Sequence, residues 1–212
     1  MRISLLVIIV LCIGFVGNSY SQFRLGATVG GNSSILLGDT PSDAVFVSDL
    51  GYSAGINADI FILEDVSILV QSIYSKKNTV LQYDVDFQYE PYDSLDISID
   101  YLEIPISLKV TAGNNIAYVI AGLSLNMTLS AMTHENPANI ETDITESIES
   151  LSLNANFGVG VQFRIGKPYL FFELRYSQGL SNLINSSSSE LHNISRMKSN
   201  STELLTGIMF TL

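Results

Sequence analysis

The sequence of 212 residues contains a single cysteine and no tryptophan. The cysteine, Cys12, lies in an apolar stretch near the N-terminus, so the rest of the chain has none. A framework of disulfide bonds is therefore excluded. An exported domain without disulfides must obtain its stability from a sizeable core or from closure of a sheet.

Basic residues are also scarce, because ten Lys and Arg stand against 21 Asp and Glu, for a formal net charge of −11. Nucleic acids and anionic surfaces are bound through clustered cations. Neither is therefore an expected partner of this chain.

Long apolar runs are absent after the N-terminus, where Arg2 precedes an apolar stretch over residues 3–16. That stretch is too short for a spanning helix, and the small residues Ser19 and Ser21 follow it. We predict a signal peptide over residues 1–21 and one β-barrel domain over residues 22–212. An uncleaved anchor helix is the alternative.

Apolar and polar residues alternate in eight segments, each about as long as a tilted strand that crosses a bilayer. The segments are residues 23–30, 52–62, 66–76, 101–110, 116–128, 153–165, 169–178 and 203–212. We therefore expect an all-β fold of eight antiparallel strands.

The connections between these segments alternate between short and long. Tight turns occupy residues 63–65, 111–115 and 166–168. Polar connections of about twenty residues occupy 31–51, 77–100, 129–152 and 179–202. Outer-membrane barrels combine short periplasmic turns with long external loops. The asymmetry predicts an up-and-down transmembrane β-barrel in the outer membrane of a Gram-negative cell, with both termini in the periplasm. A water-soluble barrel of the lipocalin type is the alternative.

The two faces of each strand differ in composition. In one segment Phe157, Val159 and Val161 alternate with Gly158 and Gly160. A soluble barrel would carry many Lys and Glu on its outside, whereas the polar faces here are mostly Gly, Ser and Asn. This composition predicts an apolar face towards lipid and a crowded polar lumen.

Charged residues on the polar faces nearly balance. The inward set is predicted to contain Arg24, Asp59, Glu103, Lys109, Arg164, Glu173 and Arg175. A four-residue turn would set Ile165 opposite Leu170, and Glu103 is expected at the level of Arg175. We expect two stacked layers of ion pairs that fill the lumen. The functional alternatives are a proton or ion relay and a narrow channel whose plug moves.

Four stretches together resemble the porin-family, PorT-like outer-membrane β-barrel domain of Bacteroidetes. They are YLEIPISLKV (101–110), FGVGVQFRIGK (157–167), ELRYSQGLSNL (173–183) and GIMFTL (207–212). The resemblance covers the mature chain and implies an eight-stranded barrel without catalytic residues. It also implies that Glu103, Glu173 and Arg175 are recurring inward charges, and it associates PorT-like members with type IX protein secretion.

The last strand carries a candidate assembly signal. Gly207, Phe210 and Leu212 fit the spacing of a signal for the barrel assembly machinery, although the family usually ends on an aromatic residue. In the absence of tryptophan, the aromatic belt on the loop side is expected to contain Tyr52, Tyr74 and Tyr176.

Few residues suggest a catalytic or metal-binding site. His134 and His192 lie in different long connections and could combine with Ser187 or Glu190 in a surface enzyme similar to a lipid A deacylase. Acidic residues between 84 and 96 could hold Ca²⁺ weakly, although their spacing is not that of an EF-hand. We expect no enzyme activity, no cofactor and no metal. The expected partners are outer-membrane lipid, lipopolysaccharide, the barrel assembly machinery and an envelope or secretion complex.

Overall fold

The computed structural model describes residues 23–39, 44–83, 94–113, 115–136, 138, 140–185 and 196–212. The predicted signal peptide lies outside these residues. No helix in the described part of the chain is long and apolar enough to span a membrane.

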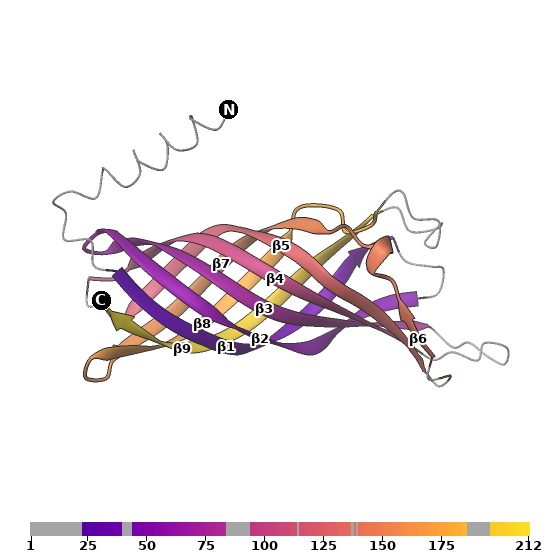
Figure 1. Ribbon diagram of the computed structural model, residues 1–212, viewed down its shortest axis with the longest axis horizontal. Helices are drawn as coiled ribbons and strands as arrows, with labels where there is room; N and C mark the ends of the chain where they lie inside the picture. The colour runs from indigo at the N-terminus through magenta and orange to yellow at the C-terminus, as the bar shows by residue number, and fades with distance from the viewer. Residues whose placement is uncertain are drawn as a thin grey trace, which may run out of the picture.

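The chain forms a closed antiparallel β-barrel (Figure 1). The ring runs β4-β3-β2-β1-β9-β8-β7-β5 and closes by pairing of β4 with β5, which confirms the expected eight-stranded barrel. A further short strand, β6, pairs with the loop end of β5. The strands are β1 (Phe23–Gly38), β2 (Ala44–Leu63), β3 (Val66–Tyr83), β4 (Ser94–Thr111), β5 (Ala117–Asn136), β6 (Ile140–Asp143), β7 (Leu151–Arg164), β8 (Pro168–Gly179) and β9 (Met197–Thr211).

Most strands extend well beyond the predicted segments on the loop side. Strand β3 was expected to end at residue 76 and continues to Tyr83, and the connection between β1 and β2 shrinks from 31–51 to 39–43. The prediction was wrong here because it followed apolar alternation. Beyond the belt that faces lipid, outward side chains such as Lys76 and Asn78 are polar. The backbone of β3 nevertheless continues to pair with β4 there.

The β7–β8 hairpin is tighter than predicted. Ile165 N donates to Pro168 O at 2.8 Å, which leaves Gly166 and Lys167 as the two turn residues. Gly166 has φ 70°, a conformation that glycine adopts without steric cost. Arg164 therefore pairs with Tyr169 rather than Ile165 with Leu170. The register moves by two residues, so every side chain keeps its predicted face.

The outer wall carries an apolar belt. Exposed apolar side chains on six strands around the ring include Ile56, Ile106, Leu123, Val159, Leu174 and Leu204. Tyr52 and Tyr176 are exposed, and the rings of Tyr52 and Tyr74 lie 6.1 Å apart. A soluble barrel would bury its apolar face, so this distribution excludes the lipocalin alternative and fits a wall in contact with lipid.

At the loop end of the lumen, apolar side chains of the described residues pack together as a layer that we call the apolar plug. Part of it comes from the strands and part from the segments after β6 and β8, which meet at a bridge between Ile148 and Ile184. Its buried members are Leu36, Ile97, Ile99, Tyr101, Ala131, Ile148, Leu183, Ile184 and Met197.

Candidate functional site

Among the described residues, eight charged ones are buried inside the barrel, each between 0% and 6% exposed. They are Arg24, Lys77, Lys109 and Arg175 with Asp59, Glu103, Glu173 and Glu203. The four positive and four negative charges cancel. Burial of a charge is costly unless it is paired, and three of the four buried cations, Lys77, Lys109 and Arg175, form ion pairs.

The cluster nearest the turns contains Lys109. Lys109 Nζ lies 2.9 Å from Asp59 Oδ2 and donates to Gln162 Oε1 at 3.0 Å. The same ammonium group lies 4.4 Å from the centroid of the Tyr118 ring. These contacts join four strands across the lumen.

The middle cluster is built around Glu173. Tyr118 OH donates to Glu173 Oε2 at 3.0 Å, and Arg175 Nε donates to Glu173 Oε1 at 2.9 Å. Arg175 Nη2 donates to Gln71 Oε1 at 2.6 Å. Tyr118 can cross the lumen because Gly160 has no side chain: a Cβ there would lie 2.3 Å from Tyr118 Cζ.

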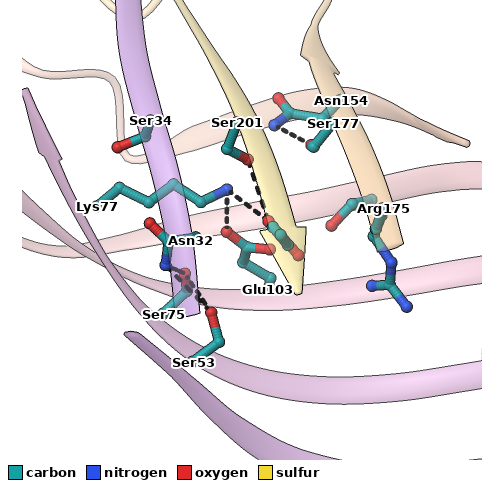
Figure 2. Close-up of polar contacts among 12 residues, drawn as sticks. Asn32, Ser34, Ser53, Ser75, Lys77, Glu103, Asn154, Arg175, Ser177 and Ser201 are labelled. Atoms are coloured by element: carbon teal, nitrogen blue, oxygen red, sulfur yellow. Dashed lines mark hydrogen bonds and ion pairs between the residues drawn. The ribbon is translucent and has the colours of Figure 1, made fainter. Parts of the chain in front are cut away.

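The cluster nearest the apolar plug consists of Lys77 and two carboxylates. Lys77 Nζ lies 2.6 Å from Glu103 Oε1 and 3.4 Å from Glu203 Oε1 (Figure 2). Ser201 Oγ donates to Glu203 Oε1 at 3.1 Å. Beside it, Asn32 bonds to serines of β2 and β3, so hydroxyl and amide groups fill the remaining space.

The structure places the seven predicted inward charges unevenly, with Arg24 and Asp59 among those that are buried. Glu103, Lys109, Glu173 and Arg175 are buried in the lumen, whereas Arg164 is exposed at its turn-side mouth. Arg164 follows the inward parity of β7, but it is the last residue of that strand and reaches water.

Glu103 and Arg175, which were expected at the same level and hence in one layer of ion pairs, do not pair with each other. Glu103 pairs with Lys77, and Arg175 pairs with Glu173 and Gln71. The expected layer was wrong in this respect because Lys77, the cation that pairs with Glu103, had been assigned to a loop.

Lys77 and Glu203 were missed by the sequence analysis. Lys77 was assigned to a loop, and Glu203 was not recognised as inward. The alternation Ser67, Leu69, Gln71, Ile73 and Ser75 would have identified Lys77 if the strand had been extended by one residue.

Residues 16–185 match the family model of the outer membrane protein beta-barrel domain. The chain belongs to this family. Outer-membrane localisation follows from the assignment, in agreement with the apolar wall. A search of curated proteins gives no match to this outer-membrane barrel.

Several solved structures of outer-membrane proteins are similar to this barrel. Neisserial surface protein A shares 14% identity over 90% of this chain and 97% of that chain, with a TM-score of 0.45. Ail of Yersinia pestis shares 11% over 89% and 99%, with a TM-score of 0.47. The protease OmpT of Escherichia coli shares 6% over 90% and 97%, with a TM-score of 0.44.

The other candidate residues of the outer-membrane barrel are placed as follows. Phe210 and Leu212 are exposed on the outer wall and at the chain end. Gly207 has a packing role, because a Cβ there would lie 2.1 Å from Ala27 O. The assembly signal remains a prediction.

The structure covers only part of the predicted enzyme and calcium sites. His134 lies on β5, with Nδ1 3.8 Å from Glu141 Oε1. The predicted partners Ser187, Glu190 and His192 lie outside the described residues. The same holds for residues 84–93 of the candidate calcium loop. Among the described residues, no group of three or more His, Cys, Asp or Glu could hold a metal ion.

Proposed function

We propose that this outer-membrane barrel is a closed, non-enzymatic envelope protein that acts through structural contacts or interactions of its external loops. The observation that carries the proposal is the filled lumen. Buried charges, most of them in ion pairs, occupy the turn-side half, and the apolar plug occupies the loop end. A narrow channel would require both layers to open, and opening the charged layers would separate buried partners at high cost.

As a specific role, we propose participation in an envelope complex for type IX protein secretion. The basis is the resemblance of four stretches, among them residues 101–110 and 157–167, to PorT-like barrels. The other proposed partners are outer-membrane lipid, lipopolysaccharide and the barrel assembly machinery.

The closed lumen predicts that the purified barrel carries no steady ion current in planar bilayers. Protein insertion is verified by heat-modifiable migration of the recovered sample on gels. The absence of current then reflects a closed lumen rather than failed insertion. Steady conductance through the wild-type barrel would favour the narrow channel over the proposed closed barrel.

The proposed orientation places Glu146 outside the cell and Glu64 in the periplasm. Both are exposed, Glu146 after β6 and Glu64 in the β2–β3 turn. A glutamyl endopeptidase added to intact cells is therefore expected to cut at Glu146 and to spare Glu64. Both sites should become available when the outer membrane is permeabilised, and a Glu64→Gln variant identifies the second cut. Cleavage at Glu64 in intact cells would reverse the orientation.

A surface enzyme on the same scaffold is the competing proposal. It depends on Ser187, Glu190 and His192, and it predicts that the purified barrel releases fatty acid from lipopolysaccharide. Release that is lost in His192→Gln would replace the non-enzymatic proposal.

A further inference from the structure

The turn-side mouth of the barrel contains two arginines beside one aromatic ring. Arg24 Cζ lies 4.0 Å from the centroid of the Tyr169 ring, and Arg164 Cζ lies 5.9 Å from the same centroid. A second ring, that of Phe61, lies 4.5 Å from Arg24 Cζ. The two rings hold the Arg24 guanidinium group in place through cation–π contacts.

Neither guanidinium group has a carboxylate partner among the described residues. Arg24 is 6% exposed, and its Nε and Nη1 are buried and donate to no protein acceptor. Asp59 is the cross-strand neighbour of Arg24, but its Oδ2 pairs with Lys109 and its buried Oδ1 accepts no hydrogen bond from Arg24 or from any other donor that the structure describes. Arg164 Nε donates to Gly166 O at 3.1 Å, and its side chain is exposed to the mouth.

This arrangement differs from the rest of the lumen, where the other three buried cations each lie within 3.0 Å of a carboxylate oxygen. Two like charges beside one ring repel each other, and an anion bound between them would offset that repulsion. Guanidinium groups offer planar forks of N–H donors that match the oxygens of phosphate. The turn end of such a barrel also lies at the level of lipid headgroups.

We propose that Arg24 and Arg164 form a phosphate-binding site at the turn-side mouth of the barrel. Arg24 is the fixed, preorganised half of the site, and Arg164 is the exposed half that completes it. The phosphate comes either from a dissolved phosphate compound or from a phospholipid headgroup that reaches over the rim. Both sources present the same oxyanion to the same two forks.

The site is tested by thermal unfolding in maltoside micelles, which contain no phosphate. Inorganic phosphate is titrated against sodium chloride of matched ionic strength. Binding to the folded state should raise the melting temperature by roughly 5 °C at about thirty times Kd, and the rise should saturate. In a second arm, phosphatidylglycerol is added to the same micelles without dissolved phosphate. A response in that arm identifies the lipid as a source, and a response to inorganic phosphate alone identifies a soluble ligand.

Variants of Arg164, the exposed half of the site, decide whether the site carries the effect. Arg164→Gln is expected to weaken phosphate binding by roughly tenfold or more, because hydrogen bonds from a charged donor are lost. Arg164→Lys keeps the charge without the fork and should bind with intermediate affinity. Lys167→Gln removes an exposed charge from the same turn and is expected to leave binding nearly unchanged.

Arg164 is exposed, so its variants should fold, which heat-modifiable migration verifies. An equal rise with sodium chloride, an equal loss in Lys167→Gln and Arg164→Gln, or no rise in either arm would overturn the site.

Discussion

Replacing Lys77 by methionine is expected to lower the free energy of unfolding of the barrel by about 3–5 kcal/mol, because it leaves buried carboxylates without their cation. Lys77 lies within ion-pair distance of both Glu103 and Glu203, and each of the three side chains is at most 5% exposed. Their burial prevents water from replacing the lost partner. Urea unfolding of the barrel in lipid vesicles measures the loss.

Two further variants separate the missing cation from other effects. Lys76→Met removes the neighbouring lysine, which points to the outer wall, and should change stability by no more than about 0.5 kcal/mol. The triple change Lys77→Met, Glu103→Gln and Glu203→Gln removes all three charges and should restore much of the loss. If the triple variant is as unstable as the sum of the single variants, the three side chains do not form one cluster.

The second large effect is expected from a charge in the apolar belt. Val159 is 56% exposed on β7, between neighbours that are also apolar. Val159→Arg should destabilise the inserted barrel by roughly 2–4 kcal/mol, because a cation near the middle of the bilayer loses its hydration. The measurement is the folded fraction after assembly into vesicles, read from heat-modifiable migration on gels.

Val45 provides the matched control for depth. It is 60% exposed, but it lies at the loop end of β2, opposite Gln82 and away from the belt. Val45→Arg should therefore assemble as the wild type does, and Val159→Thr should cost little. Equal losses in Val159→Arg and Val45→Arg would show that the belt is placed incorrectly.

Alternation of side chains along the sequence was sufficient to predict the architecture. Phe157, Val159 and Val161 face one way and Gly158 and Gly160 the other, because successive side chains in a strand point to opposite faces. The alternation of short and long connections then predicted an up-and-down order of the strands. The same parity placed Glu103, Lys109, Glu173 and Arg175 in the lumen without any knowledge of their partners. These properties are local, so the sequence by itself determined them.

Only the tertiary structure decided which charges pair. The choice of Lys77 rather than Arg175 as the partner of Glu103 depends on the length of β3 beyond the lipid belt, where apolar alternation no longer marks the strand. The two-residue β7–β8 turn and the exposure of Arg164 were also visible only in the tertiary structure. Pairing across the lumen joins strands that are distant in the chain. Its geometry therefore depends on the register of all eight strands together, which no single stretch of sequence contains.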